Sequence, residues 1–198
     1  MIGRLLIAPP LIAPPWNDLA FAAALRPAFE GMPIPSLFIP GLIAPSLARK
    51  LRAQVRGKLR PFAFPTRGQY RHAASPRDPE LEWSLHAFAQ AVTGRALARG
   101  TSRWLLLGRG DHSLRLDDAL VRCKAERFLE VTLDFSARSV ADARVVYSRG
   151  TQTLILPHAP GIVGLVERTP EVSRYDARLT HKTGRAEVFR LRLQLPFK

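Results

Sequence analysis

Apolar residues recur every three or four positions in the first half of the chain, a spacing typical of amphipathic helices. The pattern predicts three helices, over residues 17–30, 46–59 and 78–94. A residue suited to an N-cap begins each of them, and Gly94 ends the last. These N-cap residues are Asn17, Ser46 and Asp78.

From Arg103 onward the apolar period shortens to that of β-strands, and Gly, Pro, Asp and Ser separate the apolar runs. About eight strands are predicted, over residues 104–107, 112–116, 128–135, 144–147, 153–156, 162–166, 175–179 and 187–195. Helices followed by a series of short strands favour an α+β fold. We expect a double-stranded β-helix, a jelly-roll or cupin-like barrel, buttressed by the N-terminal helices.

The first 35 residues differ in composition from the rest, because the segment LIAPP occurs twice in succession within them. We therefore expect a Pro-rich N-terminal arm and helix over residues 1–35 and a barrel domain over residues 36–198. The prolines interrupt the apolar run between Leu5 and Trp16, which is also too short to span a bilayer. We expect neither a secretory signal nor a membrane partner.

Composition fits one folded domain in a reducing compartment. A chain of 198 residues with 46% hydrophobic residues can bury a core without disulfides. It contains a single cysteine, Cys123, which cannot form an intramolecular disulfide. A cytoplasmic location is the prediction.

The net charge of +14 raises the question of a nucleic-acid partner. No acidic residue occurs between Glu30 and Asp78, where basic residues gather. The candidate phosphate contacts are Arg49, Lys50, Arg52, Arg56, Lys58 and Arg60. The alternatives are a solvated helix side and an Arg-rich composition without a partner.

Several segments, taken in order, resemble the prolyl-hydroxylase-type Fe(II)/2-oxoglutarate oxygenases. They are the residues Phe38 to Leu42 before a basic helix, the Tyr70 segment, Ala91 to Gly94, Arg109 to His112, the strand Phe128 to Phe135, Leu156 to Val163, and Gly184-Arg185. The resemblance covers roughly residues 36–195. It implies Fe(II) and 2-oxoglutarate as cofactors and hydroxylation of a protein, a peptide or a small metabolite.

The resemblance also implies two histidines and one carboxylate on the iron, of which the first two are written His-x-Asp in the family. No His-x-Asp occurs in this chain, and Leu116 or Arg115 stands where the first histidine belongs. The candidate metal ligands are Asp118, His181 and His112. On one extended strand, His112 and Asp118 would be about 20 Å apart, too far to share an ion. Family-like spacing places the distal ligand near Arg174, and His181 is the nearest histidine that could replace it.

The family holds the far carboxylate of 2-oxoglutarate with a basic residue on the last strands, because a guanidinium grips a carboxylate through two donors. Arg185 matches best by position. Arg190 and Arg192 alternate with apolar residues on the final strand, and either could replace it.

Three functions follow from these observations. The first is an oxygenase with an unconventional ligand set. The second is a catalytically inactive pseudo-oxygenase that acts as a binding module, favoured by the missing His-x-Asp. The third is a basic nucleic-acid or ribosome-binding protein on the same fold. A homodimer through a barrel edge or the apolar arm is also compatible with the sequence.

Overall fold

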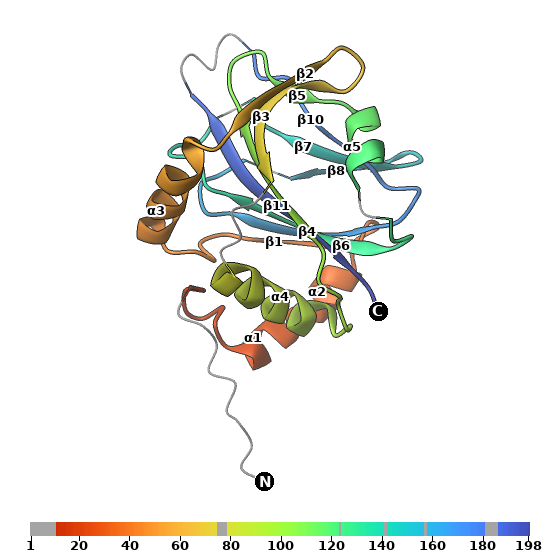
Figure 1. Ribbon diagram of the computed structural model, residues 1–198. Coiled ribbons are helices and arrows are strands. Elements are labelled where there is room, and N and C mark those ends of the chain that lie inside the picture. Colours follow the sequence, from red (N-terminus) through yellow and green to blue (C-terminus); the bar gives the residue numbers. More distant parts are fainter. Residues whose placement is uncertain (1–10, 75–78, 123, 141, 157, 181–185) are drawn as a thin grey trace.

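The computed structural model describes residues 11–74, 79–122, 124–140, 142–156, 158–180 and 186–198 (Figure 1). Its helices are α1 (Leu19–Ala23), α2 (Arg26–Glu30), α3 (Pro45–Arg56), α4 (Pro79–Thr93) and α5 (Arg115–Val121). Its strands are β1 (Ser36–Ile39), β2 (Arg60–Phe64), β3 (Gly68–Ala74), β4 (Thr101–Leu107), β5 (His112–Ser113), β6 (Phe128–Asp134), β7 (Val145–Arg149), β8 (Gln152–Leu156), β9 (Val163–Arg168), β10 (Ser173–Asp176) and β11 (Val188–Pro196). None of these helices is long and apolar enough to cross a bilayer.

The strands form one antiparallel sheet of 11 strands in the order β1-β9-β6-β11-β4-β3-β5-β10-β7-β8, with β2 paired to β3. The sheet folds back on itself, so that the short strands β5, β10, β7 and β8 lie opposite the longer ones (Figure 1). Strand β11 lies at the centre, between β4 and β6. The predicted α+β architecture, a double-stranded β-helix with N-terminal helices, is confirmed.

Alternation along β11 separates two environments, because successive side chains of a strand point to opposite faces. Phe189, Leu191, Leu193 and Leu195 belong to the large apolar core under the helices. The side chains between them, Arg190, Arg192 and Gln194, are equally buried but face the inside of the barrel.

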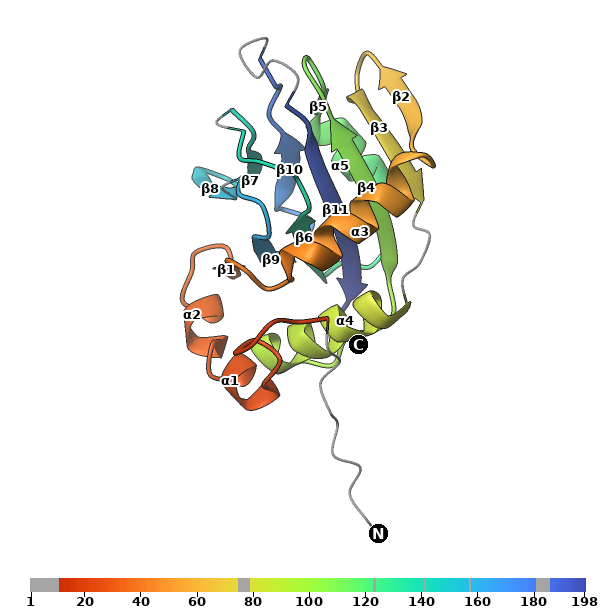
Figure 2. The same ribbon diagram turned by 90° about the vertical axis from the view of Figure 1, so that its left-hand side faces the viewer.

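Helices cover the outer face of the long strands. Figure 2 shows α3 running across the face of the sheet, while α1, α2 and α4 gather at one end of it. Helix α4 buries the stripe of Leu81, Leu85, Phe88 and Val92, spaced as a helical face requires. These side chains pack in one core with Trp104 and Leu106 of β4.

The first predicted helix is wrong in its extent, because the chain forms two short helices there. Asp18, not Asn17, caps α1, and its Oδ1 accepts from the backbone N–H of Ala20 at 2.8 Å. Pro27 lies in the first turn of α2, where its missing N–H costs no helical hydrogen bond. The second helix begins at Pro45 without a side-chain cap, so Ser46 lies inside it.

The strand predicted over residues 112–116 is also wrong beyond Ser113. Leu114 is extended and serves as the N-cap residue of α5, which continues to Val121. Asp117 and Asp118 lie in the first turn of that helix, where carboxylates are favoured by the helix dipole. Asp118 therefore lies on a helix, and the strand-based separation from His112 does not apply.

Three strands were not predicted from the sequence. Strand β1 pairs with β9, and β2 and β3 form a hairpin within the acid-free stretch. Gly68, at the start of β3, has φ +129°, and a Cβ there would lie 2.5 Å from the carbonyl oxygen of His112. Only glycine allows this approach of β3 to β5.

Candidate functional site

Charged side chains fill the inside of the barrel, where a purely structural barrel would hold apolar ones. We call them the interior charge cluster: Asp118 of α5, Glu130 and Asp134 of β6, Arg168 of β9, Arg174 and Asp176 of β10, and Arg190 and Arg192 of β11. Each is at most 4% exposed. Buried charges are tolerated only when they are paired and hydrogen-bonded, so the contacts decide what this cluster can do.

Both carboxylate oxygens of Asp118 are occupied. Oδ1 accepts from Nη2 of Arg192 at 2.7 Å, and Oδ2 accepts from Nη2 of Arg168 at 2.6 Å. The backbone N–H of Arg174 donates to Oδ2 at 3.2 Å. Two guanidiniums and one backbone amide thus donate to Asp118.

Glu130 has the densest set of partners. Nη1 of Arg168 and Nη2 of Arg192 each donate to Oε2 at 2.6 Å. On the other oxygen, Arg174 forms an ion pair at 2.8 Å and the Tyr147 hydroxyl donates at 2.8 Å. Burial by itself raises the pKa of Glu130, but the guanidiniums of Arg192, Arg174 and Arg168 outweigh it and lower that pKa to about 2.

Asp176 closes the other side of the cluster. It accepts from Nη1 of Arg174 at 2.9 Å, from Nη1 of Arg190 at 2.7 Å and from the Ser113 hydroxyl at 2.7 Å. Burial raises its pKa, yet the adjacent Arg174 and Arg190 lower it below the ordinary value. Against the effect of burial, Asp176 and Glu130 also raise the pKa of Arg174 well above its ordinary value, so that this guanidinium stays charged.

Asp134 is the fourth carboxylate of the cluster, and His158 meets it. Nδ1 of His158 hydrogen-bonds Oδ2 of Asp134, and Nε of Arg190 lies 3.5 Å from the same oxygen. His158 is therefore a partner of the cluster, a role that its sequence position before a turn did not indicate.

A smaller polar group lies beside the cluster, at the hairpin of β2 and β3. Asp117 accepts from Nη2 of Arg67 at 2.8 Å and from the Tyr70 hydroxyl at 2.8 Å. Nη2 of Arg103 donates to the same hydroxyl at 2.5 Å. Burial raises the pKa of Tyr70, and both burial and Arg103 lower the pKa of His72, so these two groups are neutral near pH 7.

A cavity of about 420 Å³, which we call the mouth cavity, opens between this hairpin and the strands β4 and β11. Its walls are Phe62, Arg67, His72, Thr101, Ser102, Arg103, Arg192 and Gln194. Two donors on its walls, Nε of Arg192 and Nε2 of Gln194, are buried without a hydrogen-bond partner among the described residues. Thr101 donates to Oε1 of Gln194 at 3.2 Å, which leaves the amide nitrogen as the free end. An anion fits a cavity of this kind, because it can accept from donors that are otherwise unsatisfied.

The candidate metal ligands are not brought together in the described part of the chain. Asp118 lies in the interior charge cluster, whereas Nδ1 of His112 lies 3.2 Å from the carbonyl oxygen of Gly110 in its own turn. His181 lies outside the described residues. Among the described residues, no three His, Cys, Asp or Glu side chains are grouped so as to hold a metal ion.

The described donors do not fit Fe(II). The oxygens of Asp118 are saturated by two guanidiniums, and Arg174, near the expected distal ligand position, is a cation that cannot coordinate iron. The ligand set with Asp118, His181 and His112 stays a prediction, since His181 is not described.

Of the arginines expected to hold a co-substrate carboxylate, Arg190 lies in the cluster and Arg185 lies outside the described residues. Arg192 has its Nη2 committed to Asp118 and Glu130, but its Nε faces no partner. Sequence reasoning missed Arg168 and Glu130. In the sequence each is only a charged residue in or next to an apolar run, and the structure shows that both strands are buried on both faces.

The basic residues proposed for nucleic acid are divided between α3, the following turn and β2. Nη1 of Arg52 donates to the carbonyl oxygen of Phe135 at 2.8 Å, and Arg56 pairs with Glu187 at 2.6 Å. Contacts within the chain therefore engage these two side chains. Contact of the remaining residues, Arg49, Lys50, Lys58 and Arg60, with phosphates stays a prediction.

No protein-family model and no curated protein matches this sequence. Solved structures do match. A prolyl-4-hydroxylase from Pseudomonas putida superposes with a TM-score of 0.68 at 14% identity, covering 90% of this chain and 100% of that one. A prolyl hydroxylase from Trichoplax adhaerens, in complex with a hypoxia inducible factor peptide fragment, gives 0.70 at 9% identity and covers 89% of this chain and 90% of that one.

HygX from Streptomyces hygroscopicus, with nickel, 2-oxoglutarate and hygromycin B bound, gives a TM-score of 0.59 at 12% identity, covering 82% of this chain and 83% of that one. At these identities the similarity shows the fold. The fold is that of the prolyl-hydroxylase-like 2-oxoglutarate oxygenases, as the order of the sequence motifs indicated.

Proposed function

Starting from the fold of the prolyl-hydroxylase-like 2-oxoglutarate oxygenases, which this chain shares, we propose that it is a binding protein without iron chemistry. The observation that carries the proposal is Asp118. Its two oxygens, which an iron site would need free, accept from Arg192 and Arg168 at 2.7 and 2.6 Å. Opening that carboxylate to a metal would take one carboxylate partner from each of two buried guanidiniums and leave Glu130 as the carboxylate that pairs with both, which costs free energy.

The guanidiniums supply the positive charge that a metal ion would otherwise supply between the carboxylates. A cation between carboxylates lets them approach inside a barrel, and Arg192 does this by bridging Asp118 and Glu130 with one nitrogen. Because arginine holds its proton at any ordinary pH, the barrel keeps this charge permanently. Carboxylates of the chain itself pair with Arg190 and Arg192, two of the arginines that could otherwise have held a co-substrate.

The ligand we propose is a small organic carboxylate in the mouth cavity. Arg67 and Arg103 place guanidiniums on its walls, and the unsatisfied donors of Arg192 and Gln194 lie buried in it. A carboxylate oxygen can accept from these donors and remove the cost of leaving them unpaired. The volume of about 420 Å³ lies within the range of small-molecule sites.

Iron binding is tested by an anaerobic titration of metal-free protein with Fe(II) and 2-oxoglutarate, followed by the visible charge-transfer band of iron-chelated 2-oxoglutarate. We expect no saturable band. A band that is lost in Asp118→Ala and in His181→Ala would overturn the proposal, because it would show an assembled ligand set.

Carboxylate binding is tested separately by calorimetry, with succinate and 2-oxoglutarate as probes and a chelator present throughout. We expect one site, weakened about tenfold or more in Gln194→Leu and in Arg103→Leu, since each loses a donor to a charged ligand. The control is Arg109→Ala, an exposed arginine outside the cavity. Affinity that is equal in all three variants would contradict a site in the mouth cavity.

The second candidate is 2-oxoglutarate-dependent oxygenation of a protein, a peptide or a small metabolite. The fold favours it, since the similar Trichoplax structure holds a peptide fragment and HygX holds 2-oxoglutarate with nickel. The iron titration separates the two candidates. For either one we propose a cytoplasmic setting and a division of the chain at residue 36. Pairing of two chains stays a prediction.

A further inference from the structure

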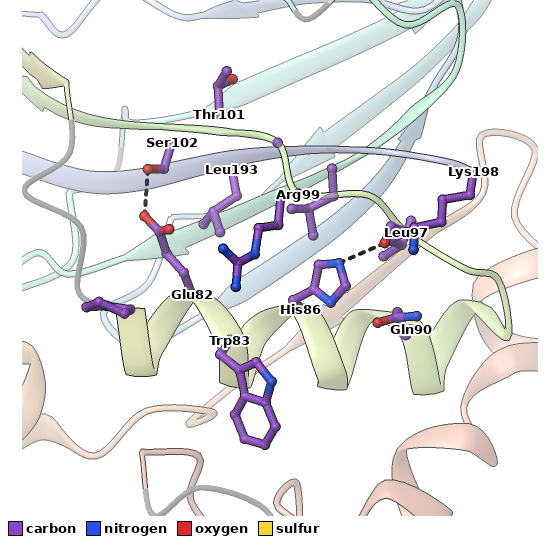
Figure 3. Close-up of a pocket in the computed structure, with 13 residues that line it drawn as sticks. Glu82, Trp83, His86, Gln90, Leu97, Arg99, Thr101, Ser102, Leu193 and Lys198 are labelled. Atoms are coloured by element: carbon purple, nitrogen blue, oxygen red, sulfur yellow. Dashed lines mark hydrogen bonds between the residues drawn. The ribbon is translucent and has the colours of Figure 1, made fainter.

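A second cavity lies outside the barrel, between helix α4 and the ends of β4 and β11 (Figure 3). Its volume is about 570 Å³. We call it the α4 cavity; it is lined by Pro79, Glu82, Trp83, His86, Gln90, Leu97, Arg99, Gly100, Thr101, Ser102, Leu193, Leu195 and Lys198. Apart from Thr101 and Ser102, it shares no lining residue with the mouth cavity.

Hydrogen bonds between the helix and the strand side hold the α4 cavity open. Glu82, His86 and Gln90 follow one another along a side of α4, as helical spacing requires. The Ser102 hydroxyl donates to Oε1 of Glu82 at 2.7 Å, and Nε2 of His86 lies 3.0 Å from the carbonyl oxygen of Leu97 (Figure 3). Because these contacts lie on both sides of the opening, they set its width before any ligand binds.

The base of the cavity is apolar. Leu97, Leu193 and Leu195 are each at most 4% exposed and come from the large core under the helices. Trp83 extends from α4 at the rim and is 45% exposed (Figure 3). The leucines at the base and Trp83 at the rim of the cavity can therefore cover the non-polar body of a ligand.

Two cations border the cavity on its strand side. Arg99 reaches from the strand side toward the helix, between Glu82 and His86, and Lys198 lies beside Leu97 (Figure 3). In the part of the chain that the structure describes, neither side chain has an ion pair or a hydrogen bond, and both residues are exposed. Arg95 and Arg127, by comparison, both pair with Glu167.

We propose that the α4 cavity binds a small organic anion, one carboxylate or phosphate group on a non-polar body. The anionic group would lie between Arg99 and Lys198, where two unpaired cations supply charge-assisted donors. The body would cover Leu193 and Leu195, and the Glu82 carboxylate disfavours a second negative group at the opposite end. The volume of about 570 Å³ accommodates a ligand of this size. The proposal does not depend on whether the barrel binds iron.

The test uses the intact chain, calorimetry and four probes that separate the parts of the ligand. Benzoate and phenyl phosphate carry an anion on a ring, benzamide carries the ring without charge, and inorganic phosphate carries charge without a ring. We expect one saturable site for benzoate, phenyl phosphate or both, and at least tenfold weaker binding of benzamide and inorganic phosphate. Tighter binding of benzoate would indicate a carboxylate ligand, and tighter binding of phenyl phosphate would indicate a phosphate ligand.

Variants then locate the site. Arg99→Ala and Lys198→Ala should each weaken the ring anion about five- to tenfold, because each removes one exposed charge-assisted contact. Arg109→Ala, which removes an exposed arginine elsewhere, should leave the affinity unchanged. Fluorescence of Trp83, isolated by comparison with Trp83→Phe, should change with the same affinity.

Two results would overturn the proposal. One is the absence of saturable binding for both ring anions. The other is binding that Arg99→Ala and Lys198→Ala leave unchanged, which would place the anion elsewhere. Retained benzoate binding in Arg103→Leu, a variant of the mouth cavity, would show that the two cavities act separately.

Discussion

Nη2 of Arg192 donates to Oδ1 of Asp118 at 2.7 Å, which joins the last strand of the barrel to helix α5 across 74 residues of sequence. The same nitrogen donates to Oε2 of Glu130 at 2.6 Å. One guanidinium thus bridges two carboxylates that would otherwise repel each other inside the barrel. The bridge links the members of the interior charge cluster to one another. Removing one member leaves the remaining buried charges short of a partner.

Glu130→Gln should destabilise the protein by about 3–5 kcal/mol, because it leaves the buried charges of Arg168, Arg174 and Arg192 short of a partner. Urea unfolding of the two proteins measures the difference. The matched control is Glu126→Gln at an exposed position, which should change the stability by no more than about 0.5 kcal/mol. Equal effects of the two substitutions would mean that the cluster does not contribute to stability.

Stability should fall steeply in acid. The folded-state pKa of Glu130 is about 2, against an ordinary value of 4.5, so the folded state binds its proton less readily than the unfolded chain does. The contribution is fully present above about pH 5 and is lost as the pH falls toward 2. Asp176, whose pKa is also lowered, acts in the same direction. Unfolding free energies across this range should decrease by several kcal/mol, and by less in Glu130→Gln.

The folded barrel should not need a divalent metal. Because guanidiniums satisfy Asp118, the melting temperature should be the same with a chelator and with excess Fe(II) under anaerobic conditions. A ligand of the native state at 100 times its Kd adds about 2.7 kcal/mol, which a thermal shift detects readily. A clear rise with Fe(II) would argue for a metal site that includes residues outside the described part of the chain.

Gly100→Ala should be severely destabilising. A Cβ at this position would lie 1.5 Å from the carbonyl oxygen of Gln194, a backbone atom that cannot move without breaking the pairing of β4 with β11. Gly57→Ala is the matched control, since its φ is −72° and no atom lies within 4 Å of the added Cβ. It should be neutral or stabilise by up to about 1 kcal/mol. Comparable melting temperatures for the two variants would contradict the close approach.

Local patterns determined much of the architecture. The apolar stripe of α4 and the alternation of apolar and polar residues in β11 repeat within a few residues. Each pattern by itself specifies which face of its helix or strand is buried. The order of helices and strands then favoured the barrel. The same reasoning failed at residues 112–118, where the strand ends at Ser113 and α5 begins after Leu114, a residue that makes no side-chain cap bond and so gives no helix-start signal in the sequence.

What the sequence by itself determined is the fold class, the arginine excess and the absence of a His-x-Asp motif. Only the tertiary structure decided how those charges are used. Asp118, Glu130, Arg168 and Arg192 come from α5, β6, β9 and β11, and their contacts span between 38 and 74 residues of sequence. No local pattern encodes such pairing, because whether a charge is exposed, paired or free to hold a ligand depends on neighbours that only folding brings within hydrogen-bond distance.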